Sequence, residues 1–159
     1  NLTGRTYKTI PNYLSKILKL DDSVETFVIV SNYFTSFRKN VDKALLNSGD
    51  FKKKEIFDEL KSLLETKGIS GYILSEAYGE NIPYFDNVQI KTKKSFHDRY
   101  IIIKRKDGTD FISLTAELDN FDWVDAVEKR AIKLRDTKVL HIEKNELPNT
   151  VQEGLERIL

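Results

Sequence analysis

Three consecutive β-branched residues, Val28, Ile29 and Val30, form the centre of the segment ETFVIVSNYF. Such residues favour β-strands, and successive side chains of a strand point to opposite faces. An apolar run without alternation therefore indicates a strand that is buried on both faces. A sheet covered on both faces is a layered arrangement of strands and helices. We expect a central strand over residues 25–31 of such a domain.

The remaining periodicities predict the other layers. Apolar residues at helical spacing predict helices over 13–20, 36–47 and 51–67, and Gly68 caps the last of these. A second strand follows over 69–77, then a turn over 78–87 and an extended segment over 87–95.

The second half of the chain predicts a hairpin, a helix, a strand and a final helix. Two strands, 98–104 and 110–114, flank Asp107-Gly108, which is a hairpin signal. A helix is expected from Trp123 to Leu134, a strand over 138–144 and a helix over 150–159. The order α-β-α-α-β-β-β-β-α-β-α predicts an α/β layered domain with a mixed β-sheet flanked by helices.

Composition narrows the class of protein. The 159 residues are 40% hydrophobic and 32% charged, as in one soluble globular domain, here taken as residues 1–159. No cysteine is present, which excludes disulfides and thiolate zinc sites. No apolar run approaches a membrane span, and no secretion signal is visible. We expect a cytoplasmic domain, excised from a longer protein because the chain begins at Asn1, with no metal and no cofactor.

Positive charge gathers in one segment although the net charge is only +1. Its basic residues are Lys91, Lys93, Lys94, Arg99, Lys104, Arg105 and Lys106. Asp98 is the only acid among them. A local basic face can bind phosphates. The alternative is a solvated strand whose alternate residues are simply charged.

The segment SFHDRYIII holds His97 inside this basic cluster. An imidazole can attack phosphorus or transfer protons, and a guanidinium offers paired donors to phosphate oxygens. On a strand, His97 and Arg99 would share a face. A hydroxyl of Ser113 or Thr115 on the returning hairpin strand could lie beside them. Alternatively, His97 is an ordinary hydrogen-bonded residue at the mouth of a strand.

This arrangement resembles the phospholipase D superfamily, over roughly residues 25–120. Those proteins carry His-x-Lys-x-x-x-x-Asp, then a hairpin, a Gly-Ser-like segment and an Asn. FHDRYIII is similar to a variant branch with His-Asp-Arg that is associated with prokaryotic phage-defence and mobile-element proteins and with a non-catalytic membrane-binding relative. The end of ETFVIVSNYF is also similar to the early central strand of that fold.

The resemblance implies roles for individual residues. His97 matches the nucleophile, Arg99 the phosphate-binding lysine and Ser113 the supporting serine. Further phosphate-binding candidates are Lys94, Lys104, Thr115 and Asn120. The chain departs from the family at position 104, where the aspartate is Lys104, and at Ile112, where a glycine is usual. Only one motif is present, so the resemblance implies a homodimer that joins two.

Three functions follow as hypotheses. The first is a metal-independent nuclease or other phosphodiesterase in prokaryotic defence or a mobile element. The second is a catalytically silent domain that binds nucleic acid or an anionic lipid. The third is a protein-interaction or oligomerisation module. His141, in an apolar-alternating segment, is interpreted as structural. An acidic run between Glu117 and Asp125 is interpreted as a solvated helix start rather than a metal site.

Overall fold

The computed structural model describes residues 6–7, 18–31, 58, 60–75, 84–90, 99–114, 121–123, 132–134 and 139–159. The described strands are β1 (Thr6–Tyr7), β2 (Val24–Val30), β3 (Ser70–Ser75), β4 (Phe85–Gln89), β5 (Arg99–Arg105), β6 (Gly108–Leu114), β7 (Phe121–Trp123), β8 (Ile132–Leu134) and β9 (Val139–Ile142). The described helices are a segment over 60–67, a 3-10 turn η2 (Lys144–Glu146) and α3 (Asn149–Glu156).

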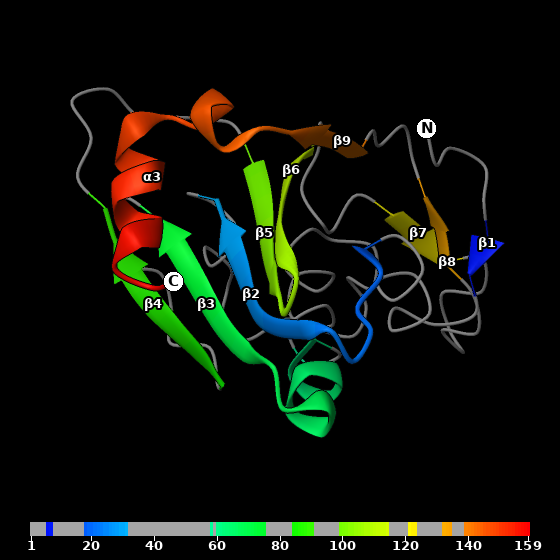
Figure 1. Cartoon of the computed structure of the whole chain (residues 1–159). Helices are drawn as coiled ribbons and strands as arrows, with labels where there is room; N and C mark the ends of the chain where they lie inside the picture. Colours follow the sequence, from blue (N-terminus) through cyan, green and yellow to red (C-terminus); the bar gives the residue numbers. More distant parts are fainter. Residues whose placement is uncertain are drawn as a thin grey trace.

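Six of these strands form one mixed sheet in the order β4-β3-β2-β5-β6-β9 (Figure 1). Strands β2, β3 and β4 run parallel, whereas β5 is antiparallel to β2, β6 to β5 and β9 to β6. The three short strands β1, β8 and β7 form a separate antiparallel sheet. The mixed sheet with helices confirms the expected α/β class.

The central strand is buried on both faces, as its unbroken apolar run predicts. Phe27, Val28 and Val30 have no exposed side-chain surface, and Ile29 is 3% exposed. Val28 and Val30 point to the face that α3 covers, here called the α3 face. Phe27 and Ile29 point to the other face. We call it the isoleucine face, because its buried residues in the four central strands include Ile29, Ile73, Ile101 and Ile112.

Helix α3 packs closely against the sheet at a glycine, Gly154. Leu147, Val151 and Leu155 join the core of the α3 face. A Cβ added at Gly154 would lie 2.7 Å from Ile90 and 2.8 Å from Leu74. Only a residue without a side chain permits this approach of the helix to β3 and β4.

The helix over 60–67 covers the isoleucine face and ends as the sequence predicts. Gly68 has φ +69°, its N–H donates to Glu65 O, and the next N–H, from Ile69, donates to Leu64 O. This pair of bonds is the Schellman motif that a left-handed glycine permits. The side chain of Leu64 reaches the sheet at Gly71 of β3, because a Cβ added at Gly71 would lie only 3.3 Å from it.

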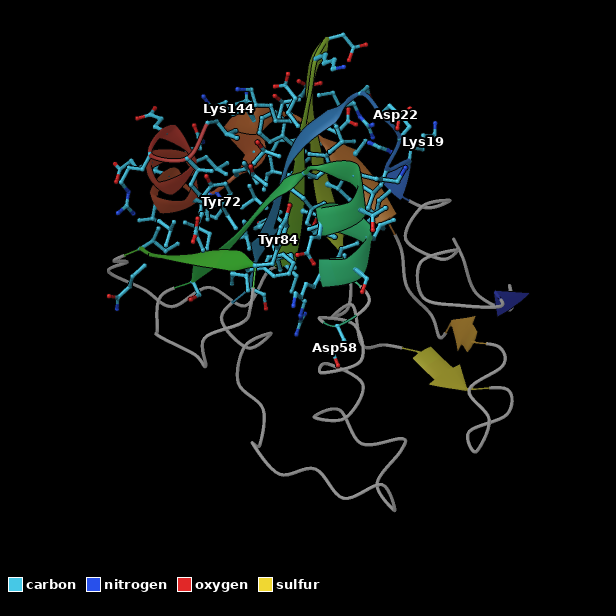
Figure 2. The ribbon with its side chains drawn as sticks, turned by 90° about the horizontal axis from the view of Figure 1, so that it is seen from below. Lys19, Asp22, Asp58, Tyr72, Tyr84 and Lys144 are labelled. Atoms are coloured by element: carbon cyan, nitrogen blue, oxygen red, sulfur yellow. The ribbon has the colours of Figure 1, made fainter. Side chains whose placement is uncertain are left out.

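Tyr84, the residue before β4, lies at the same corner (Figure 2). Its hydroxyl donates to Ile69 O and lies 3.4 Å from Leu64 O, so the start of β4 is attached to the end of the helix. Desolvation raises the pKa of this phenol, with Glu65 adding to the effect. Phe85, next along the chain, is 6% exposed and meets Tyr84 edge to face.

Two predicted elements are wrong where the structure describes them. The expected helix from Trp123 to Leu134 is not formed at either end, because β7 and β8 pair there with Trp123 opposite Ile132. The sequences Phe-Asp-Trp and Ile-Lys-Leu also alternate apolar and polar residues, and pairing favoured that period. The predicted turn over 78–87 ends early, because Phe85 already pairs with Gly71 in the parallel ladder.

The hairpin between β5 and β6 forms one residue earlier than Asp107-Gly108 predicts. Arg105 pairs with Gly108, which leaves Lys106 and Asp107 as the two-residue loop. Partners across the hairpin therefore shift by two residues from the predicted register. Ile101 lies opposite Ile112, and Ile102 lies opposite Phe111, instead of opposite Leu114 and Ser113.

The predicted helices over 13–20 and 36–47 lie outside the described residues except for the end of the first, where Leu18 is helical. The strand over 138–144 is observed as β9, and the last helix as α3. The extended segment over 87–95 is described only to Ile90.

Gly154→Val should destabilise the domain by about 2–3 kcal/mol, because the new side chain would overpack against buried Leu74 and Ile90. Urea unfolding measures the loss. Glu153→Ala changes the exposed neighbour on the same helix and should stay within about 0.5 kcal/mol of wild type. Equal stability of Gly154→Val and wild type would contradict the close approach of α3.

Candidate functional site

One edge of the sheet collects one end of each of its six strands. Strands β2, β3, β4 and β6 finish there, and β5 and β9 begin there, because β5 runs antiparallel to β2 and β6, and β9 runs antiparallel to β6. In open α/β sheets, ligands bind outside the carboxyl ends of the parallel strands. This edge is therefore where a site is expected on physical grounds.

At this edge the last row of side chains is polar on four adjacent strands, and Leu114 continues the row on β6. Gln89 pairs with Ser75, and Val30 pairs with both Leu74 and Tyr100. One residue further along β2, Ser31 therefore stands level with Ser75 and Arg99, and its N–H donates to Leu74 O at 3.2 Å. The polar row is thus Gln89, Ser75, Ser31 and Arg99, on four adjacent strands.

All four side chains of the polar row project from the isoleucine face. Ser31 follows Ile29 by two residues, Ser75 follows Ile73 by two, and Arg99 precedes Ile101 by two, so the alternation of each strand aligns them. The preceding row holds the buried isoleucines. The change from isoleucine to polar residues is abrupt and occurs on β2, β3 and β5 alike.

Burial distinguishes the members of the polar row. Ser31 is 1% exposed and Ser75 is 5% exposed, and they are the only buried polar residues in the described part of the chain. Arg99 and Gln89 are partly exposed, although Nε of Arg99 is buried. All four residues take part in polar or electrostatic contacts. The row therefore combines two buried hydroxyls with an amide and a guanidinium that are partly exposed.

Three of the candidate residues named from the sequence fall within the described residues: Arg99, Lys104 and Ser113. The candidates His97, Lys94, Thr115 and Asn120 lie outside them. Of the three, only Arg99 stands in the polar row. Their assignment to a site from sequence remains a prediction.

Ser113 does not lie beside Arg99. It pairs with Tyr100, whereas Arg99 pairs with Leu114. Residues opposite each other in an antiparallel pair point to the same face. Ser113 therefore shares the α3 face with Tyr100, and Arg99 points from the isoleucine face.

Lys104 is also separated from Arg99. It pairs with Thr26 and Thr109 and points to the α3 face, five residues further along β5. That interval is about 17 Å in a strand. A carboxylate at position 104 would not contact Arg99 either. The departure from the family pattern at this position therefore removes no acid from the polar row.

Arg105, another member of the basic cluster, is a structural residue. Its Nε donates to Asp110 Oδ2 at 2.7 Å, its Nη2 to Leu18 O at 3.0 Å and its Nη1 to Lys19 O at 2.8 Å. Lys19 has φ +51°, a left-handed conformation that follows the last helical residue, Leu18. The guanidinium thus satisfies carbonyls at a helix end, which a cation there stabilises.

Asp21 completes the contacts of Arg105 at 3.3 Å (Figure 2 shows the neighbouring Lys19 and Asp22). Hydrogen bonds from the Ser23 side chain and backbone, followed by the charge of Arg105, hold the pKa of Asp21 below its usual range. This cluster lies at the start of β2, so it is at the opposite end of the sheet from the polar row.

Other sequence candidates pack or lie at the surface. Tyr84 and Phe85 are aromatic residues that could stack on a base, but they are engaged with the helix end and the core. His141 is exposed on β9, opposite Ile112. Within the described ranges no group of three His, Cys, Asp or Glu residues is placed to hold a metal ion. None of the described helices has the length and apolar character needed to cross a membrane.

Ser31, Ser75 and Gln89 were not identified from the sequence. The available signal was positional: each is the first polar residue after an apolar stretch of its strand, in FVIVS, YILS and VQ. Such serines are common at strand ends, so only the pairing of strands reveals that they form a row with Arg99.

The chain matches no protein-family model, no curated protein and no solved structure.

Arg105→Ala should lower the free energy of unfolding by about 2–4 kcal/mol, since it leaves Asp110 and two helix-end carbonyls without their donor. Arg105→Lys should restore less than half of this loss, because an ammonium cannot reproduce the planar array of donors. Chemical denaturation checks both values. A lysine variant as stable as wild type would show that charge alone suffices.

Asp21→Asn should make the stability of the fold less dependent on pH in acid. A carboxyl with a lowered folded-state pKa stabilises the fold at neutral pH, and this contribution disappears as the pH falls through that pKa, below about pH 4. The asparagine keeps an oxygen acceptor but cannot titrate. As the pH is lowered from 7 to 3, the unfolding temperature of wild type should therefore fall more steeply than that of Asp21→Asn. The exposed Asp22→Asn serves as control, and a curve for Asp21→Asn parallel to wild type would refute this.

Proposed function

We propose that this domain binds and cleaves phosphodiesters at the carboxyl edge of its mixed sheet. The observation that carries the proposal is the place of Arg99, in a polar row with two buried serines directly above an apolar layer. A guanidinium with neighbouring hydroxyls is a phosphate-binding set. None of the residues of this row carries a carboxylate that would repel an anion.

His97 supplies the chemistry in this proposal. It precedes Arg99 by two residues, and it matches the nucleophile of the superfamily that the sequence resembles. In the first step an N–P bond forms, one P–O ester bond breaks, and the leaving oxygen takes a proton from water. In the second step water attacks phosphorus and gives a proton to the hydroxide that the first step left, the N–P bond breaks, and the imidazole is regenerated. Arg99 would bear the charge on the phosphate oxygens in both steps.

Nucleic acid is the substrate class that we propose, in the setting of a prokaryotic defence or mobile-element protein. This setting and the homodimer that would join two motifs come from the resemblance to the phospholipase D superfamily, whereas the cytoplasmic location is an expectation from the composition of the chain. Fewer basic residues of β5 lie at the proposed phosphate site than the basic cluster in the sequence suggests. Of them, Arg99 is at this edge, while Lys104 and Arg105 lie at the other end of the strand.

A catalytically silent phosphate-binding domain is the second candidate. It is favoured by the composition of the polar row, because Arg99 is its only ionisable residue. Serine and glutamine can hold a phosphate but do not exchange protons near neutral pH. In this case the ligand would be nucleic acid or an anionic lipid surface.

His97→Ala should abolish cleavage of labelled single- and double-stranded DNA and RNA in the presence of EDTA, while binding stays within a few-fold of wild type. Arg99→Ala should weaken binding by about 10-fold or more and thereby lower cleavage as well. Fluorescence anisotropy measures binding at several salt concentrations, and gel electrophoresis measures cleavage.

The assay separates the candidates. Binding by wild type that Arg99→Ala weakens, without any product, would identify the silent domain. Phosphatidylserine vesicles test the lipid alternative in a sedimentation assay. If wild type neither binds nor cleaves any of these probes, the phosphate-binding proposal is wrong.

A further inference from the structure

We infer that Ser31, and not Ser113, supplies the hydroxyl that binds phosphate together with Arg99, with Ser75 extending the same anion site. This inference rests on the proposed function and adds residues to its site. It departs from the resemblance, which assigns the supporting role to Ser113.

The first argument is the direction of the side chains. Ser31 stands level with Arg99 on the adjacent strand and projects from the same face, because both continue the alternation of Ile29 and Ile101. Ser113 pairs with Tyr100 and projects from the opposite face. A phosphate held by the Arg99 guanidinium on the isoleucine face has the sheet itself between it and Ser113.

The second argument is spacing. Neighbouring strands lie about 4.8 Å apart, so side chains of Ser31 and Arg99 begin about that far from each other. Two oxygens of one phosphate can accept hydrogen bonds from donors on adjacent strands at this separation. Ser75 lies one strand further and level with Ser31, at a distance that suits another oxygen of the same phosphate or the next ester group.

The third argument is burial. Ser31 and Ser75 are 1% and 5% exposed, so a hydrogen bond from either hydroxyl to an anion would form away from bulk water. Such bonds to a charged group are stronger than the same bonds in solvent. Arg99 and Gln89 are partly exposed, so the polar row is not sealed from solvent along its whole length.

The experiment compares matched serine variants in the full chain. Dissociation constants of a labelled single-stranded 12-mer DNA, and inhibition constants of inorganic phosphate as competitor, are measured for wild type, Arg99→Ala, Ser31→Ala, Ser75→Ala and Ser113→Ala. Ser31→Ala should weaken binding of both probes by about 10-fold, the loss expected for one hydrogen bond to a charged group. Ser75→Ala should lose less, and Ser113→Ala should match wild type.

Thermal unfolding of each variant controls for folding. If Ser31→Ala does not fold, Ser31→Cys replaces it, because a thiol is close in size but a weak donor, and the same loss of affinity is expected. The ratio of the phosphate inhibition constant to that of chloride is the readout that a purely structural serine would leave unchanged.

The outcomes separate this inference from the proposed function. If Arg99→Ala loses affinity while Ser31→Ala and Ser75→Ala bind as wild type does, the site stands and the assignment of the serines is overturned. Loss of affinity in Ser113→Ala alone would overturn it in favour of the family pattern. Absence of binding by wild type would overturn both the inference and the proposed function.

Discussion

The pairing of β5 between β2 and β6 is the constraint on which the rest of the structure depends. β2 supplies one hydrogen-bonded neighbour over Val24–Val30, and the hairpin supplies the other over the whole of β6. With both neighbours fixed, β5 cannot shift by one residue without moving Ile101 and Ile103 from the isoleucine face to the α3 face. The same register places Arg99 at the edge. The register of β5 thus determines both the apolar core and the position of the candidate site.

The two ends of β5 show how context divides similar residues between roles. Arg105 is enclosed by Asp110, Asp21 and the carbonyls of a helix end, so its charge is used to hold the 18–23 segment on the hairpin. Arg99 stands at the other end of the strand beside hydroxyl groups. The protein therefore has both a structural guanidinium and a candidate ligand-binding guanidinium on one strand.

The position of the polar row also explains why several connecting segments can serve one site. The chain leaves or enters the sheet at this edge after β2, β3, β4 and β6 and before β5 and β9. The segment before β5 contains His97, and the segment after β6 contains Thr115 and Asn120. Rigid strands thus supply the guanidinium and hydroxyls, and the residues predicted to do chemistry belong to the connecting segments. Functional residues are commonly distributed in this way between scaffold and loops.

The sequence by itself determined the α/β class, the central strand around Ile29, the hairpin, and the cap at Gly68, because local preferences and apolar periodicity encode them. It also singled out Arg99 by its neighbours. It could not place the turn to the residue, predict the strands that end at Trp123 and Leu134, or reveal that Ser31, Ser75 and Arg99 form a row while Ser113 points away. Those features follow from the register between strands far apart in the chain. Register is decided by which side chains fit together in the core, and the tertiary structure alone contains that information.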